Sequence, residues 1–126
     1  MTNLKVTCSG VEFPNPLVLA SGVLGVTGKS FEYTVNKGCG GITTKSIWKE
    51  PHPGHKNPTM FGTPEYFMNA VGLSDDGIGK AIEELSEYLP TRKAPLILNI
   101  VGGLKQDFVD IAKAIGDLPE PQTWWR

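Results

Sequence analysis

The sequence predicts an α/β fold, specifically a partial (β/α)8 TIM barrel in which an N-terminal hairpin precedes about three βα units. Two observations predict this class. Strand-like runs at 17–20, 41–45 and 96–101 alternate with segments whose apolar residues have helical spacing. Alternation of this kind is typical of a parallel sheet covered by helices. A complete barrel needs about 250 residues, so the 126 residues correspond to part of one.

The first expected element is a hairpin. Apolar runs at 4–7 and 11–13 flank Ser9-Gly10, and a two-residue turn of this composition closes an antiparallel pair of strands. The run at 17–20 follows Pro16 and is continuously apolar. It is therefore expected to be the first strand of the parallel sheet.

The middle of the chain is expected to hold one helix, one strand and a long loop. Thr27 can cap a helix at 28–37 and Gly38 can end it, while 41–45 forms the second strand. The stretch from 50 to 72 has few periodic apolar positions, so we expect it to be irregular. Loops of this length in compact domains are commonly functional.

The last predicted elements are a helix at 75–89, a strand at 96–101 and a helix that ends near Gly116. The apolar face of the final helix carries Leu104, Phe108, Ile111 and Ile115. We therefore place one domain at 1–116 and an atypical tail at 117–126. The tail holds Trp124-Trp125 and has no strand pattern, which favours a truncation or frameshift, or else a genuine tail that packs its tryptophans on the domain.

Composition excludes several function classes. Lys and Arg number 12 against 13 Asp and Glu, so no basic field would attract nucleic acid or an anionic membrane. No apolar stretch reaches the ~18 residues of a spanning helix, and the N-terminus lacks the apolar segment of a signal peptide. Cys8 and Cys39 are expected to be reduced thiols. Together these features predict a soluble cytoplasmic protein.

Candidate site residues stand at the ends of the first two strands, where barrels of this type place their active sites. Ser21-Gly22 would let a flat ring approach the backbone closely, or would simply form a turn. Lys45-Ser46 ends the second strand. Lys45 could stabilise a reduced flavin, hold a carboxylate or form a Schiff base, and it could equally be a surface lysine.

Two asparagines extend this set. Asn69 opens the segment 69–73, where its side chain suits a pyrimidine edge or a carboxylate and the amides near Gly72 suit an anion. An Asx turn that leads into the next helix is the alternative. Asn99 lies within an apolar strand, where a buried polar side chain needs partners, so a ligand contact and a structural role both fit.

Two weaker signals are set aside. His52 and His55 flank Pro53-Gly54 without a third ligand at a useful spacing, so we expect exposed loop histidines and no metal. Gly102-Gly103 could approach a phosphate, but no nucleotide-loop pattern surrounds it.

Four segments together resemble the soluble, class 1 dihydroorotate dehydrogenases. They are N-P-L-V-L-A-S-G at 15–22, G-G-I-T-T-K-S at 40–46, N-A-V-G-L at 69–73 and L-I-L-N-I-V-G at 96–102. Each lies at a predicted strand end or in a loop, and the resemblance extends from residue 3 to about 116. The pyrimidine-reducing domains of dihydropyrimidine dehydrogenase are similar as well.

The resemblance implies an FMN cofactor and the oxidation of dihydroorotate to orotate in pyrimidine biosynthesis. The residues that would contact FMN are Ala20, Ser21, Gly22, Lys45, Ser46 and Asn99. Those that would hold the substrate are Lys45, Asn69, Ala70, Val71, Gly72 and Leu73. The pattern is closer to the NAD-linked subclass, class 1B, which implies an iron–sulfur partner subunit, and the parent enzyme is expected to be a homo-oligomer.

The resemblance also implies what the chain lacks. In this family a cysteine or serine in a motif like N-x-S-C-P-N takes a proton from C5 while a hydride moves from C6 to flavin N5. No such motif occurs here, and Cys39 is in the wrong place, so no catalytic residue is assigned. We therefore expect the chain alone to be inactive. The alternatives are a non-catalytic half-barrel that binds a flavin or nucleotide, and a lysine-dependent aldolase at Lys45.

Overall fold

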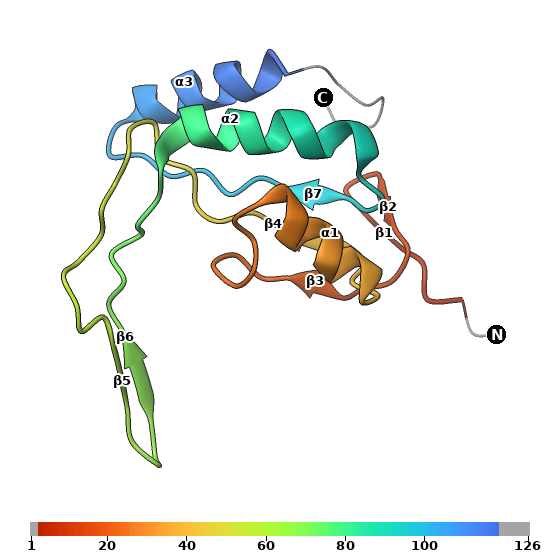
Figure 1. Ribbon diagram of the computed structural model, residues 1–126. Helices are drawn as coiled ribbons and strands as arrows, with labels where there is room; N and C mark the ends of the chain where they lie inside the picture. The colour runs from red at the N-terminus through yellow and green to blue at the C-terminus, as the bar shows by residue number, and fades with distance from the viewer. Residues whose placement is uncertain (1–2, 119–126) are drawn as a thin grey trace.

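A three-stranded parallel sheet forms the centre of the protein, and helices pack against it (Figure 1). The computed structural model describes residues 3–118. The strands are β3 (Val18–Leu19), β4 (Gly41–Thr43) and β7 (Leu96–Ile97), paired in the order β3-β4-β7. This confirms the predicted α/β class, with each strand shorter than expected. Within residues 3–118, β3 and β7 are both edges, so the sheet does not close into a barrel.

The helices are α1 (Gly28–Asn36), α2 (Gly77–Tyr88), a 3₁₀ turn η1 (Leu89–Thr91) and α3 (Lys105–Gly116). Thr27 caps α1 as predicted, because Ser30 N donates to Thr27 Oγ1 while Thr27 N donates to Ser30 Oγ. Gly38 follows this helix with a φ of +97°, a conformation that favours glycine.

The register of the sheet explains where the core lies. Leu19 pairs with Ile42, which pairs with Leu96, so these three side chains share one face of the sheet. That face packs on the helices, and the core consists of Phe31, Ile42, Leu85, Tyr88, Leu89 and Leu96. Val18 and Ile97 belong to the opposite face and are 40% and 43% exposed. The sheet therefore has one face covered by helices and an opposite face that is partly exposed, where the buried Phe13 ring lies beside Gly41.

Helix α3 is covered less completely than its sequence predicts. Ile111 is fully buried, whereas Leu104 and Phe108, on the same predicted apolar face, are 69% and 40% exposed. Near the middle of the helix, Lys49 Nζ lies 2.7 Å from Asp110 Oδ2 and joins α3 to the segment after β4. Only the part of α3 around Ile111 lies against the body, so the apolar face that helical spacing predicts is buried over part of its length.

The N-terminal hairpin is confirmed. Strands β1 (Val6–Cys8) and β2 (Val11–Phe13) pair in antiparallel fashion. Ser9 and Gly10 have φ of +49° and +80°, as a two-residue turn with two left-handed positions requires. Both cysteines are free, as expected.

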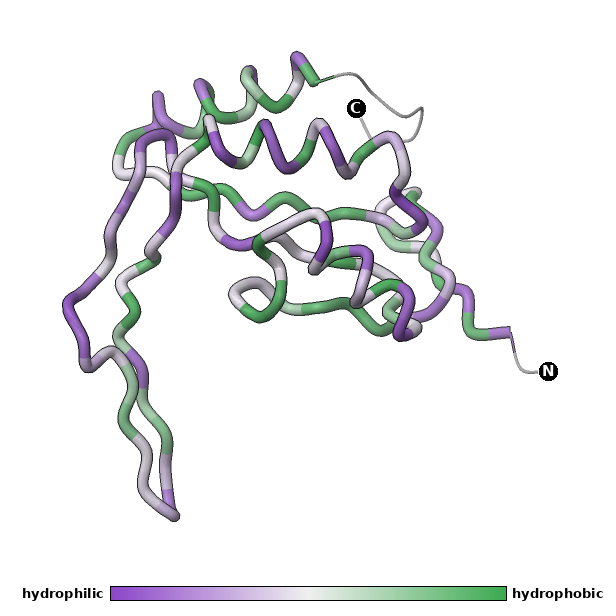
Figure 2. Tube along the Cα trace, in the orientation of Figure 1, coloured by the Kyte–Doolittle hydropathy of each residue, from purple (hydrophilic) through white to green (hydrophobic). Residues whose placement is uncertain are grey.

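The stretch from 50 to 72 is not irregular throughout, and that prediction was wrong. It contains a second hairpin, β5 (Met60–Gly62) and β6 (Phe67–Asn69), which projects from the body (Figure 1). All six strand residues are exposed, and both strands carry apolar residues (Figure 2). Successive side chains of a strand point to opposite faces, so the neighbours Met60 and Phe61 place apolar side chains on both faces. The alternation that marks a half-buried strand is therefore missing from the sequence.

The tail expected at 117–126 falls almost wholly at 119–126, outside the described residues. In the part of the chain that the structure describes, none of the helices is both long enough and apolar enough to cross a membrane.

Candidate functional site

Three residues from separate segments meet at the carboxyl end of the sheet. The side-chain amide of Asn99 donates to Ser21 Oγ at 2.8 Å and to Ser46 Oγ at 3.0 Å. Ser46 is buried and the other two are half-buried. We call Ser21, Ser46 and Asn99 the strand-end cluster. All three were candidates from the sequence, and the fold brings them together.

Backbone pairing beyond the short strands holds Asn99 in place. Thr44 N donates to Ile97 O at 2.9 Å and Ile47 N to Asn99 O at 2.8 Å, so the ladder between β4 and β7 continues past the strand ends. The backbone N of Asn99 donates to Thr44 Oγ1 at 3.0 Å. Thr44, which sequence reasoning did not select, thus supplies a side-chain acceptor for the Asn99 backbone.

The cluster has hydrogen-bonding capacity left for a ligand. The Asn99 amide nitrogen is used by the two hydroxyls, but its oxygen accepts no hydrogen bond within residues 3–118. Each serine hydroxyl accepts from Asn99 and keeps its own O–H to donate. The cluster can therefore offer hydroxyl donors and one amide acceptor, which suits a ring edge with carbonyl and N–H groups, such as the pyrimidine part of a flavin.

Ala20 and Gly22 lie beside Ser21 and are exposed. Gly22 has a φ of +88°, and a Cβ built on it would meet nothing within 4 Å. Space is therefore open next to this backbone, and the left-handed conformation explains the glycine. A flat ring could approach the segment without displacing a side chain.

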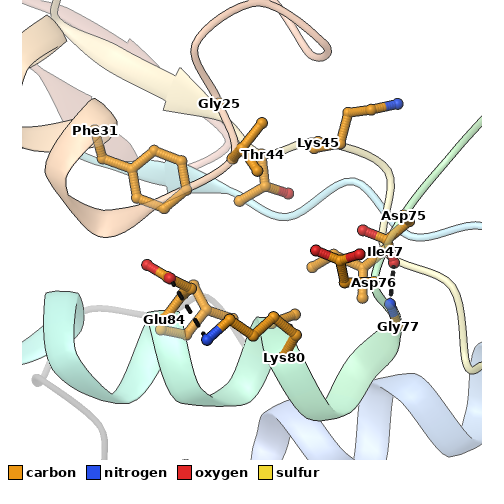
Figure 3. Close-up of a pocket in the computed structure, with 13 residues that line it drawn as sticks. Gly25, Phe31, Thr44, Lys45, Ile47, Asp75, Asp76, Gly77, Lys80 and Glu84 are labelled. Atoms are coloured by element: carbon orange, nitrogen blue, oxygen red, sulfur yellow. Dashed lines mark hydrogen bonds and ion pairs between the residues drawn. The ribbon is translucent and has the colours of Figure 1, made fainter. Parts of the chain in front are cut away.

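Lys45 is fixed through its backbone rather than through its ammonium group. Its N–H donates to Gly25 O at 2.7 Å. The side chain is half-buried, and Figure 3 shows it pointing away from Lys80 and Glu84. Among the described residues no carboxylate forms an ion pair with Lys45. Its positive charge is available to an anionic ligand.

The pocket in Figure 3 is not the place for a flavin. It lies between the segment after β4 and helix α2, and its volume is about 50 Å³. Pockets for cofactors and drug-sized ligands have volumes of about 300–1,000 Å³. The open surface around the strand-end cluster fits a large flat ring better.

In the segment 69–73, two carbonyls are bound by other segments and three successive N–H groups are unbound, while Ala70 N donates to Thr59 O at 2.7 Å. Asn69 is the exposed last residue of β6. The carbonyl of Val71 accepts from His55 N at 3.0 Å, and the carbonyl of Leu73 accepts from Trp48 Nε1 at 2.9 Å. The N–H groups of Val71, Gly72 and Leu73, which we call the amide row, donate to no acceptor among residues 3–118. In that range no hydrogen bond joins the amide row to the strand-end cluster.

The expectation that both histidines are exposed was wrong for His52. Its ring stacks on Trp48 with the centroids 4.6 Å apart and the planes 8° from parallel. His52 is half-buried, while His55 is exposed as expected. In the described part of the chain, no group of three or more His, Cys, Asp or Glu side chains is placed to hold a metal ion.

Gly102-Gly103 has a structural role. Asp107 Oδ2 accepts from Gly103 N at 3.1 Å and from Leu104 N at 2.9 Å. The carboxylate thereby binds amides at the start of α3, where unpaired N–H groups favour negative charge. The Gly103 amide is thus already bound within the protein.

The sequence did not predict the two contacts of Trp48 with Leu73 and Asp75, because these partners are distant from Trp48 in the chain. Trp48 reaches Leu73, and Asp75 Oδ2 accepts from Trp48 N at 3.0 Å and from Gly77 N at 2.8 Å. No local motif marks Trp48. Asp75 is the first residue of the helix predicted at 75–89, and the start of a helix is a common place for a capping carboxylate.

Comparison with known proteins identifies relatives over almost the whole chain. The family model described as Dihydroorotate dehydrogenase matches residues 3–121. The catalytic subunit of dihydroorotate dehydrogenase B (NAD(+)) from Methanocaldococcus jannaschii is 39% identical over 113 residues, which are 87% of this chain and 37% of that protein. The Methanocella arvoryzae protein of the same name is 39% identical over 114 residues, or 89% of this chain and 38% of that one. This chain therefore spans a little over a third of the length of these relatives.

Solved structures share the fold of the described residues. A ligand-free DHODH from Eimeria tenella superposes with a TM-score of 0.80 and covers 90% of this chain and 35% of its own. The complex of that enzyme with ferulenol gives a TM-score of 0.78, with 90% and 34% covered. Both are 20% identical in sequence, so the likeness concerns the fold.

Proposed function

This chain belongs to the dihydroorotate dehydrogenase family, and from that premise we propose that it carries part of a site for FMN-dependent oxidation of dihydroorotate to orotate in pyrimidine biosynthesis. The observation that carries the proposal is the strand-end cluster. Three residues that the family resemblance assigns to the flavin come from separate segments and are joined by Asn99. The two bonds use both N–H groups of the Asn99 amide, and its oxygen, which accepts no hydrogen bond within residues 3–118, is left for a ligand.

The residues at the strand ends fit FMN by their chemistry. Ser21, Ser46 and Asn99 would bind the polar edge of the flavin ring, whose flat face would lie on the open backbone at Ala20 and Gly22. FMN, when bound, supplies the acceptor for the hydride. Lys45 would place its ammonium group near the flavin and the substrate carboxylate, where positive charge favours both.

The segment 69–73 fits the substrate. The three unbound N–H groups of the amide row are donors for an anionic or carbonyl oxygen, and backbone donors of this kind form anion sites. The Asn69 amide would recognise the pyrimidine edge, with Ala70 beside it. Orotate and dihydroorotate offer both a carboxylate and a carbonyl-rich ring.

The rest of the enzyme is also part of the proposal. Strands β3 and β7 would continue into a (β/α)8 barrel, and the NAD-linked activity named for the relatives would involve an iron–sulfur partner subunit and a homo-oligomer. The 126 residues contain no match to the motif of the catalytic base, and a general base contributes typically 10²–10⁴-fold to the rate. The chain alone would therefore bind ligands without turnover. The cytoplasmic location stays a prediction.

Titration of the purified chain with FMN tests the proposal, with flavin absorbance and fluorescence as the signals. Asn99→Ala should raise the Kd by roughly tenfold, because it removes two hydrogen bonds that orient the serines. The control is Asn36→Ala, which removes an exposed asparagine at the end of α1. Circular dichroism of both variants checks that the fold is kept.

Equal FMN affinity of the Asn99→Ala and Asn36→Ala variants would contradict a flavin site at the strand-end cluster. Reduction of an artificial dye by the chain in the presence of dihydroorotate would contradict the proposed inactivity. The two measurements are separate, because one reports binding and the other turnover.

A further inference from the structure

We infer that Trp48 is a positioning residue for the substrate, since its indole N–H fixes the backbone that presents the amide row. The inference rests on the proposed function, in which the N–H groups of Val71, Gly72 and Leu73 bind orotate. Trp48 lies two positions beyond the segment 40–46 that resembles the family, and none of the roles assigned so far includes it.

Trp48 binds the loop at two points. Its side-chain Nε1 donates to Leu73 O at 2.9 Å, and its backbone N donates to Asp75 Oδ2 at 3.0 Å. The two acceptors lie on either side of Ser74. Asp75 in turn accepts from Gly77 N at 2.8 Å, at the start of α2. The segment after β4 therefore holds the end of the loop against the helix that follows it.

His52 keeps the indole in place by stacking on its face. The rings are nearly parallel, with centroids 4.6 Å apart. The backbone of His52 pairs with that of Asp75 through two hydrogen bonds of 2.8 Å. The buried His52 Nδ1 has no hydrogen-bond partner within residues 3–118, so the ring contributes a flat surface there rather than a polar contact.

The anchors bracket the peptide group that matters for binding. Val71 O is held by His55 N and Leu73 O by Trp48 Nε1, and the peptide between Gly72 and Leu73 lies between these two points. In a trans peptide the C=O of one residue and the N–H of the next point in opposite directions, so the bond at Val71 O orients the Gly72 N–H and the bond at Leu73 O orients the Ser74 N–H. The Leu73 N–H belongs to the peptide that these two fixed peptides flank. The carbonyls bind inside the protein, and the N–H groups are left for a ligand.

Leu73 shows why an anchor is required. Its φ is +52°, a left-handed conformation that a residue with a branched side chain rarely adopts. Gly72, with φ of +77°, adopts such a conformation easily. Leu73 lacks the conformational freedom of glycine, so it needs a contact from another segment to keep this positive φ. The indole N–H supplies it, since Leu73 O accepts from no other group among the described residues.

The test compares aromatic substitutions that keep or remove the indole N–H. Trp48→Phe keeps a flat face for His52 but loses the donor to Leu73. A second variant carries benzothienylalanine at position 48, which has the shape of the indole with sulfur in place of N–H. His52→Phe keeps the stack, and Tyr33→Phe changes an exposed aromatic residue on α1 as the matched control.

Two readouts are taken on the isotope-labelled 126-residue chain. The first, without ligand, is the heteronuclear NOE of residues 71–74 and the carbonyl ¹³C shift of Leu73. The second is the Kd for orotate in the presence of FMN. Both variants at position 48 should lower the NOE and shift the Leu73 carbonyl signal, and they should weaken orotate binding by roughly threefold to tenfold, as expected for one lost hydrogen bond. His52→Phe and Tyr33→Phe should behave like the parent.

The outcomes separate the inference from the proposed function. Failure of the parent chain to bind orotate counts against the proposed function, and the NOE and the carbonyl shift then decide the role of Trp48. Parent-like NOE values, carbonyl shift and orotate affinity in the benzothienylalanine variant would overturn that role, since its shape is kept and only the donor is gone. An equal loss of affinity in Tyr33→Phe would also overturn it, because the effect would not be specific to the indole.

Discussion

The strand-end cluster and the amide row differ in which of their polar groups are hydrogen-bonded within the protein. In the cluster, polar side chains from three segments bind one another through Asn99. In the amide row, the protein binds the carbonyls of Val71 and Leu73 and leaves the N–H groups without acceptors in the part of the chain described. The cluster is therefore held together before a ligand arrives, with donors and one acceptor to spare, whereas the N–H groups of the amide row would find acceptors only in a ligand.

The two regions also depend on different parts of the fold. The cluster is tied to the sheet by the ladder that continues from β4 and β7 past Ile47 and Asn99. The amide row depends on Trp48 and Asp75, which belong to loops. Changes in the core should thus affect both regions, and changes in the loops should affect the amide row alone. Three substitutions test this difference.

The largest effect is expected from Ile42→Ala. Ile42 is fully buried, and it lies in register between Leu19 and Leu96 on the face that packs on the helices. Truncation of such a side chain lowers the free energy of unfolding by about 2–5 kcal/mol, which is a large part of the stability of a small domain. Urea denaturation measures the loss.

The control for Ile42→Ala is Val18→Ala, on the partly exposed face of the sheet, where the side chain is 40% exposed and a much smaller loss is expected. Amide spectra at moderate urea should show the cluster and the amide row lost together in Ile42→Ala. Loss of the amide row while the cluster persists would show that the sheet does not support both regions.

This dependence on the sheet explains which features the sequence could predict. Strands β3, β4 and β7 lie within strand-like runs of the sequence, and each run contains or precedes one of Ser21, Ser46 and Asn99. Because the strands are parallel, these three residues meet at the same edge of the sheet. The extent of each strand could not be predicted, because only backbone pairing defines it. The family resemblance, rather than periodicity, selected the segment 69–73.

The features that could not be predicted depend on contacts between distant residues. Trp48 reaches Leu73 and Asp75 across 25 and 27 positions, and no local pattern indicates either pair. The hairpin of β5 and β6 has exposed apolar residues on both faces, so it lacks the alternation of a half-buried strand. The exposure of Leu104 and Phe108 depends on where α3 lies against the body, which helical periodicity does not determine.

An intermediate effect, confined to the loop, is expected from Asp75→Ala. The carboxylate accepts two backbone hydrogen bonds, from Trp48 at 3.0 Å and from Gly77 at 2.8 Å. Removal of a charged acceptor from partly buried amides costs about 1–3 kcal/mol. Urea denaturation gives the loss, and amide shifts at residues 71–77 should change while those of the strand-end cluster stay.

Asp76→Ala is the matched control for this change. Asp76 is exposed, and its side chain makes no capping hydrogen bond although it stands at the N-cap of α2. It should lower the stability by much less than Asp75→Ala. Equal effects of the two substitutions would mean that negative charge near the helix start matters and the specific bonds of Asp75 do not.

The smallest effect is expected from Asp110→Asn, which breaks the ion pair between α3 and the residue next to Trp48. The hydrogen bond from Lys49 lowers the pKa of Asp110, with a further contribution from Gln106, and Asp110 raises the pKa of Lys49 in turn. A carboxylate with a lowered pKa stabilises the fold above its unfolded pKa, and this contribution is lost as the pH falls through the folded value. For Lys49 the contribution is present below its unfolded pKa and is lost as the pH rises through the folded value.

The side chains of Lys49 and Asp110 are 42% and 33% exposed, so salt should weaken the ion pair. The urea midpoint of Asp110→Asn should therefore lie slightly below that of the parent at about pH 7 and converge with it towards about pH 3. Glu83→Gln, which breaks an exposed pair with Lys80 inside α2, is the control and should change the midpoint less because it joins no separate segments. A difference for Asp110→Asn that persisted at the acid end of the range would mean that packing around Asp110, and not its charge, joins the Trp48 segment to α3.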